Sequence, residues 1–231
     1  MTVVRRLTTF AAVATGAVAL ALALPGGAVG APSPDTDRAA AIAGPGDLLG
    51  AYESNIEALR KFGMDPFLYP TAAAFCNDAS TFGLVPAVAG AVPGPWPKTT
   101  VAIPGLDMTA VEAGQTMFTF VPFGVAADKR TDTGMRVAWL NVSNGRSGTA
   151  SMGPIGDVLS AMIPPEVPAD VRPVAEKAVQ DFFLASLPVG GIRAVPVDTG
   201  KGMVLAAVFG TVQSGDRSCF FLPTVGMTTI P

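Results

Sequence analysis

The clearest pattern of apolar positions lies between residues 115 and 152, where most of the β-forming residues before the last helix are gathered. Residues 135–143 run directly into Asn144-Gly145, a dipeptide that tolerates the positive φ angles of a tight hairpin turn. Apolar residues alternate onto both faces of this arm, which is typical of a strand covered on both sides. The pattern predicts a hairpin whose first arm lies inside a sheet. The small, polar second arm, residues 146–151, is predicted nearer an edge.

Two segments carry apolar residues at helical spacing. From Asp47 to Phe62, such residues recur every three or four positions, charged residues occupy the other face, and Gly63 provides a stop. Residues 170–187 repeat the pattern before Pro188. We predict that both helices pack their apolar stripes on the sheet, and that residues 155–163 form a shorter helix. The stripe of the second long helix consists of Val171, Val174, Ala175, Ala178 and Phe182.

β character dominates the chain from Lys98 onward, apart from these helices. The last three predicted strands follow one another with short connections, which indicates an antiparallel meander. The longest of them is apolar on both faces and is predicted to be central. Pro196 lacks an amide donor and marks its strand as an edge or a bulge. Besides the hairpin arms, the predicted strands are residues 99–103, 115–125, 192–197, 203–212 and 218–222.

Residues 64–97 are interrupted too often by Pro and Gly to predict long regular elements. Residues 71–77 allow a short helix that presents Cys76. Within residues 93–97, Trp96 is flanked by prolines in an extended segment. It either covers one end of the core or stacks on a sugar or a partner chain. We favour the covering role, because large aromatic side chains are mostly buried.

The beginning of the chain has the pattern of an export signal. Arg5 and Arg6 precede an apolar run over residues 7–24, and a small-residue cleavage site ends at Ala31. A membrane-anchoring helix is the alternative, but the run is barely long enough to span a bilayer. The arginine pair permits a twin-arginine signal, although its surroundings fit ordinary secretion better. We predict a signal peptide (residues 1–31), a flexible leader (32–45) and a single secreted α+β domain (46–231), located outside the cell or in its envelope with no transmembrane anchor.

The protein has only two cysteines, Cys76 and Cys219. An exported chain with one pair most simply forms one disulfide, and two separate buried thiols are the alternative. Together these patterns predict an α+β fold, in which an antiparallel sheet of about five to six strands is covered by two main amphipathic helices and clamped by the Cys76–Cys219 disulfide.

The charge of the protein excludes one class of partner. Its 15 Lys and Arg and 18 Asp and Glu give a net charge of −3. Without residues 1–31, which contain two of the basic residues and none of the acidic ones, the charge is 13 − 18 = −5. An acidic domain repels phosphate backbones, so we do not expect nucleic acid as a partner.

The protein contains no histidine. This excludes Ser-His-Asp and Cys-His catalysis and the usual His-containing zinc sites. A serine activated by a lysine is an alternative, but no Ser-x-x-Lys spacing occurs. Paired carboxylates are another, but no Asp or Glu pair is distinctive. The serine and lysine candidates are Ser143, Ser147, Ser151, Lys129 and Lys201.

Residues 127–134 form the densest charged cluster in the chain. Asp128 and Asp132 lie within it, but they lack the spacing and the closing Glu of a calcium loop. A solvated connection is the better interpretation. We therefore predict no catalytic residue, no metal site and no cofactor.

The leading hypothesis is a secreted, non-catalytic cell-envelope or extracellular protein. It binds an apolar or amphiphilic ligand such as a lipid, or a protein partner, because Met, Phe and Val are abundant while catalytic side chains are scarce. The alternatives are a secreted hydrolase that uses a Ser/Lys pair or two carboxylates, and an inhibitor-like module that presents Trp96. The candidate ligand-binding residues are Trp96, Met117, Phe118, Phe120, Trp139 and Phe209.

Overall fold

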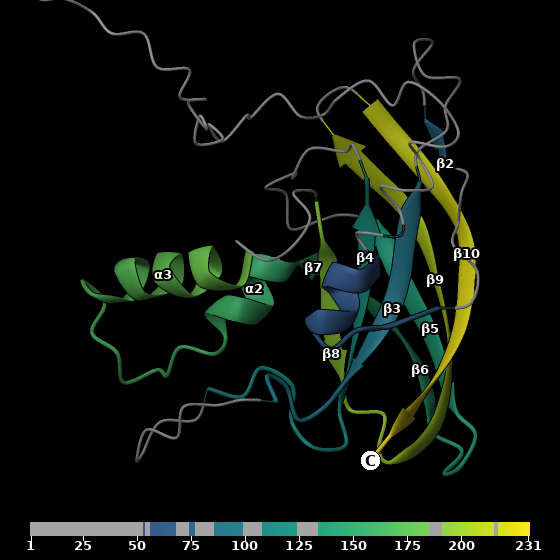
Figure 1. The fold of residues 1–231 in the computed structure, drawn as a ribbon, viewed down its shortest axis with the longest axis horizontal. Helices are drawn as coiled ribbons and strands as arrows, with labels where there is room; N and C mark the ends of the chain where they lie inside the picture. Colours follow the sequence, from purple (N-terminus) through teal and green to yellow (C-terminus); the bar gives the residue numbers. More distant parts are fainter. Residues whose placement is uncertain are drawn as a thin grey trace, which may run out of the picture. The chain divides into compact units, whose positions relative to one another are not determined.

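The computed structural model describes residues 53, 56–67, 74–76, 86–98, 108–123, 134–184, 191–214 and 217–231, with the backbone alone at 74–76, 184, 214 and 217. The described chain forms two antiparallel five-stranded sheets (Figure 1). The first sheet has the order β1-β3-β4-β8-β7, with β1 Asp65–Pro66, β3 Ala87–Pro93, β4 Thr116–Pro122, β8 Arg193–Val197 and β7 Gly153–Pro154. The second has the order β2-β10-β9-β5-β6, with β2 Ala74–Cys76, β10 Arg217–Ile230, β9 Gly202–Ser214, β5 Met135–Asn141 and β6 Ser147–Ser151.

The two sheets pack face to face and enclose one core. Phe118 and Phe120 of β4 meet Val137 of β5 and Phe221 of β10 in a single buried cluster. The rings of Phe120 and Phe221 lie edge to face with their centroids 4.7 Å apart, a favoured geometry for aromatic pairs. Alternation along each strand places every second residue in this core. The described fold is therefore a β-sandwich.

Helical segments cover the outer face of the first sheet. Residues 56–61 are helical, α2 spans Ile155–Ser160 and α3 spans Arg172–Leu184. They lie on the side of the sandwich away from β10 (Figure 1). Leu59 and Leu159 pack there against Met117 of β4 in a second buried cluster, which Val179 and Phe183 of α3 flank. The central strands β3 and β4 of the first sheet are thus buried on both faces.

The predicted α+β fold, with one sheet under two main helices, is wrong. The strands divide into two sheets because β8 and β9 are not neighbours: residues 198–201 cross from the first sheet to the second. The predicted antiparallel meander is wrong for the same reason. Val195 and Val197 of β8 instead pack against the common core from the opposite side.

Strand β3 lies in the region where Pro and Gly predicted no long element. Its glycine has a packing role, because a Cβ at Gly90 would lie 2.7 Å from Met64 Cγ. The prolines are compatible with a strand because Pro86 precedes it and Pro93 ends it. The short helix suggested for residues 71–77 is also wrong, because residues 74–76 form strand β2.

Several predicted elements are confirmed. The Asn144-Gly145 hairpin joins β5, which lies between β6 and β9, to the edge strand β6, and Gly145 has a φ of 76°. Strand β9 is central in its sheet. The first predicted helix is confirmed at residue 53 and over residues 56–61. Its remaining positions up to residue 55 lie outside the described residues. The predicted strand 99–103, the signal peptide and the leader also lie outside the described residues.

The predicted Cys76–Cys219 disulfide is not found among the described side chains, because only the side chain of Cys219 is described. The backbone register of β2 and β10 places Cys76 opposite Cys219. Cys219 itself is buried and is not a free thiol.

Candidate functional site

The second sheet differs from the first in what lies on its outer side. Along β9, Val204, Ala206 and Val208 point into the core, so the residues between them point outward. The same alternation runs through the neighbouring strands β5 and β10. Outward positions of an exposed sheet are usually polar. On this sheet, many of them are large and apolar.

We call this surface the apolar face and define it by eight residues. Their side chains belong to β5 and the residue that follows it, to β9 and to β10. Each exposes between 38% and 54% of its surface, whereas their inward neighbours are buried. A patch of this kind is larger than scattered exposed residues on ordinary monomers and marks interaction surfaces. The eight residues are Leu140, Val142, Met203, Leu205, Phe220, Leu222, Val225 and Met227.

The backbone register arranges the apolar face in rows across the strands. Leu140 pairs with Leu205, and Leu205 pairs with Met227, so these three side chains form one row. Two residues away on each strand, Ala138, Ala207 and Val225 form the neighbouring row in the same way. A row of large side chains therefore lies beside a row of mostly small ones. The side chains of this face therefore form open rows.

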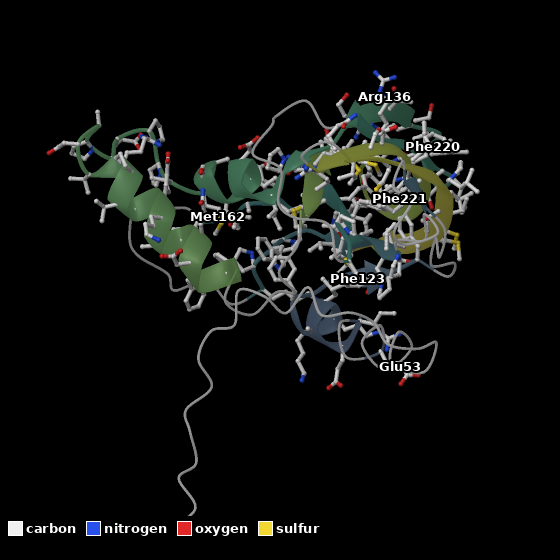
Figure 2. The ribbon with its side chains drawn as sticks, turned by 90° about the horizontal axis from the view of Figure 1, so that it is seen from above. Glu53, Phe123, Arg136, Met162, Phe220 and Phe221 are labelled. Atoms are coloured by element: carbon white, nitrogen blue, oxygen red, sulfur yellow. The ribbon has the colours of Figure 1, made fainter. Side chains whose placement is uncertain are left out.

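Charge is nearly absent from these strands. Their sequences contain two charged residues, Arg136 in β5 and Arg217 at the first position of β10, and neither is acidic. Arg136 lies opposite Phe209 at one end of the face and projects away from the body (Figure 2). Phe220 and Phe221 take opposite sides of β10, with Phe221 in the core. Ser147 and Thr149 of β6 give the face a polar border.

The apolar face was not recognised as a surface in the sequence. Apolar residues on both faces of the 135–143 segment predict a strand that is covered on both sides, whereas the structure leaves Leu140 and Val142 exposed. The feature of the sequence that could have indicated this exposed face is the near absence of charged residues from its strands. The 13 residues of β9 contain no charged side chain, although several of them are exposed.

A second exposed apolar surface lies on α3. The predicted apolar stripe of this helix is not its buried face: Val174 and Phe182 expose 70% and 75% of their surfaces. Val179 and Phe183 pack against the helix-covered cluster instead. The predicted packing of this stripe on a sheet is wrong, because α3 rests against α2 through the opposite side. Gln180, for example, donates a hydrogen bond from Nε2 to Ser160 Oγ at 3.3 Å.

The structure does not gather the predicted ligand-binding residues into one site. Phe118 and Phe120 are buried between the sheets, and Trp139 packs against the same core. Met117 points to the other face of β4 and is buried under the helices. Phe209 is partly buried and has its place on the outer side of β9, beside the apolar face.

Trp96 is buried, with 3% of its surface exposed. Its Nε1 donates a hydrogen bond to the carbonyl oxygen of Phe62 at 2.7 Å, and its ring contacts the rings of Phe62 and Phe183. The side chain thus joins the end of the first helical segment to α3. This is the covering role that the sequence favoured, and it leaves no exposed ring for a recognition loop.

The serine and lysine candidates do not form a pair. Ser143 Oγ accepts a hydrogen bond from the backbone N–H of Met203 at 3.0 Å. Ser147, Ser151 and Lys201 are exposed, and Lys129 lies outside the described residues. Among the side chains that the structure describes, no lysine amine is hydrogen-bonded to a serine hydroxyl. No group of three or more acidic or cysteine side chains able to hold a metal occurs in the same part of the chain. Asp128 and Asp132 lie outside it.

One polar cluster stands at the end of the sandwich where the sheets are connected. Arg146, in the β5–β6 turn, donates from both terminal nitrogens to Asp198, at 3.1 and 3.0 Å. This hydrogen bonding, with a smaller contribution from the charge of Arg146, holds the pKa of the Asp198 carboxyl below its usual range. The buried Asn141 binds the backbone of the neighbouring residues 199–201. The cluster is structural, because each of its groups is occupied by another part of the chain.

None of the helices in the described part of the chain combines the length and the apolar composition that crossing a membrane requires. The comparisons with known proteins add no assignment: no family model matches the chain, and no curated protein or solved structure is detectably similar to it.

Proposed function

We propose that this protein is an exported, non-catalytic binding protein that holds a protein partner on the apolar face. The observation that carries the proposal is the row of Leu140, Leu205 and Met227, which lies exposed at the centre of a sheet whose other side is a complete core. Leaving such side chains in water forgoes about 25 cal/mol for each Å2 of apolar surface. A partner that covers them recovers that free energy.

The shape and the charge of the face favour a protein over other occupants. A small apolar molecule needs a concave site that surrounds most of its surface, whereas these side chains form open rows. A cavity of about 440 Å3 does occur, but none of the eight residues of the apolar face lines it; its lining consists of Asp65, Pro93, Gly94, Pro95, Lys98, Thr229 and Pro231. An anionic membrane surface would call for a cluster of basic residues, and the net charge of the protein is −3.

The experiment is a capture assay with the exported protein immobilised and an extract of its own host's envelope and medium as the source of partners. Leu205→Lys places a charge at the centre of the face and should abolish retention of the specific partner, because burying an unpaired charge costs several kcal/mol. Mass spectrometry identifies the proteins that the wild type retains and the variant does not.

Val174→Lys on α3 is the matched control, because it makes the same kind of change at an exposed valine outside the apolar face. It should retain the partner as the wild type does. An identical set of retained proteins for the wild type and Leu205→Lys, with both folded by circular dichroism, would refute the proposal.

A further inference from the structure

We infer that the protein partner is a second copy of this chain, packed with its apolar face against the same face of the first copy. The inference rests on the proposed function and specifies the occupant. It follows from three properties of the apolar face: its area, the sizes of the side chains in its rows, and the placement of its charges.

The area is close to that of a stable dimer interface. Eight side chains that each expose slightly less than half of a full area on the order of 200 Å2 present roughly 700 Å2 together, and all of them except Phe220 lie within the overlap described below. Specific interfaces bury about 800 Å2 on each partner, and homodimer interfaces are the more apolar class. The exposed apolar residues of α3, Val174 and Phe182, supply less than this even together with Val171, which precedes the helix.

The rows make the face complementary to itself. In a two-fold arrangement of facing sheets, the symmetry axis can lie between the sheets and along the rows. When it passes midway between the row of Leu205 and the row of Ala207, the large row of each copy meets the small row of the other. Large side chains then face small ones on both sides of the axis, which is how well-packed layers interdigitate. Strand β9 lies over its symmetry mate, and the twist of the sheets crosses the strands by about 30°.

The charges of the face are compatible with this arrangement. Two acidic proteins repel one another, but the strands of the face contain no acidic residue. Arg136 lies one row beyond Ala138 and Ala207, toward one end of the face. The axis described above moves its symmetry mate to the opposite end, about three rows away, or roughly 20 Å at about 7 Å per row. Each Arg136 then lies opposite Val142 of the other copy, in the outermost pair of overlapping rows, and the two guanidinium groups stay far apart at opposite ends of the interface.

The decisive experiment is sedimentation velocity of the purified full-length exported protein over a range of concentrations. We expect a reversible dimer for the wild type and for Val174→Lys. Leu205→Lys should raise the dimer dissociation constant by at least about 100-fold, because its ammonium would be buried without a partner. Thermal unfolding by circular dichroism verifies that the variants are folded.

Ala207→Leu separates self-complementary packing from general adhesion. The substitution enlarges the apolar surface. It also places a large side chain in the small row, against which the large row of the other copy packs. We expect it to weaken the dimer by about tenfold or more, because overpacking an interdigitated layer is unfavourable. A general apolar adhesion would instead be strengthened by the same change, and a tighter dimer would refute the arrangement.

The failure of this inference can be told apart from failure of the proposed function. A protein that remains monomeric at about 100 μM, well above the dissociation constants of specific dimers, overturns the inference. If the capture assay then still shows a different protein that depends on Leu205, the proposed function stands. If Leu205→Lys affects neither assay, both are refuted.

Discussion

The outer faces of the two sheets have similar side chains but different surroundings. Met117, near the start of β4, is fully buried under helical segments, whereas Met227 of β10 exposes half of its surface. Both methionines lie on strands whose opposite side faces the common core. The comparison shows that apolar residues on both faces of a strand do not mean that other elements of the described chain cover both faces.

The connections between strands explain the difference. Helices α2 and α3 lie in the long connection between β7 and β8, and they fold back over the first sheet. In the second sheet, β5 and β6 are joined by residues 142–146, and β9 and β10 by residues 215–216. These two turns contain too few residues to reach over the outer face. Within the described part of the chain, that surface is left exposed.

The largest effect is expected from placing a lysine under the helices. Met117→Lys should destabilise the protein by about 4–5 kcal/mol, because a fully buried lysine stays in the interior only by shifting its pKa by several units. Met227→Lys, the same substitution on the uncovered face, should change the free energy of unfolding by less than about 1 kcal/mol. Urea denaturation of both variants measures the difference.

The measurement belongs at low protein concentration, so that association through the apolar face does not add to the apparent stability. Equal destabilisation by the two lysines would mean that the outer face of the second sheet is covered within a single chain. The contrast between the sheets would then be wrong.

A smaller effect is expected at the junction between the sheets. Asn141 is buried, its Nδ2 donates to the carbonyl oxygens of residues 199–201 at 3.0–3.2 Å, and its Oδ1 accepts from the N–H groups of Ser143 and Asn144. Asn141→Ala leaves several of these backbone groups without partners and should cost about 2–4 kcal/mol in urea denaturation.

Asn144→Ala is the control, because Asn144 binds the same backbone segment from an exposed position. Water can replace the bonds that it loses, so we expect a cost of about 1 kcal/mol or less. If the two substitutions cost the same, burial is not what gives Asn141 its importance.

The sequence predicted the local elements better than their assembly. The hairpin at Asn144-Gly145, the central position of β9 and the helix over residues 172–184 follow from turn chemistry and periodicity, which act over a few residues. The division into two sheets does not. Whether the chain crosses from one sheet to the other at residues 198–201 depends on contacts with β4 and β5, which are distant in sequence.

The prediction of the ligand-binding residues failed for a related reason. The predicted ligand-binding residues were chosen for size, and size alone does not distinguish a core residue such as Phe118 from an exposed one such as Phe220. The helix α3 shows the same ambiguity, since its stripe of Val174 and Phe182 has helical spacing yet points away from the sandwich. Periodicity assigns side chains to a face, but only the connections determine what covers that face.

The smallest effect concerns the ion pair that joins the β5–β6 turn to the connection between the sheets. The hydrogen bonds from Arg146 lower the pKa of Asp198, so this carboxylate favours the folded state at pH values above its unfolded pKa of about 3.9. The contribution should disappear as the pH falls through the lowered pKa of the folded protein. Arg146 stays protonated throughout this range, so the titration belongs to Asp198. Because both side chains are exposed, we expect Asp198→Asn to lower Tm by only about 1–2 °C at pH 7.

At pH 2 the wild type and Asp198→Asn should unfold at the same temperature, since protonated Asp198 no longer accepts two charged hydrogen bonds. In an Arg146→Met background, Asp198→Asn should have no effect at either pH, which makes a double-mutant cycle the control. A Tm difference that persists at pH 2 would show that Asp198 stabilises the junction between the sheets through its shape rather than its charge.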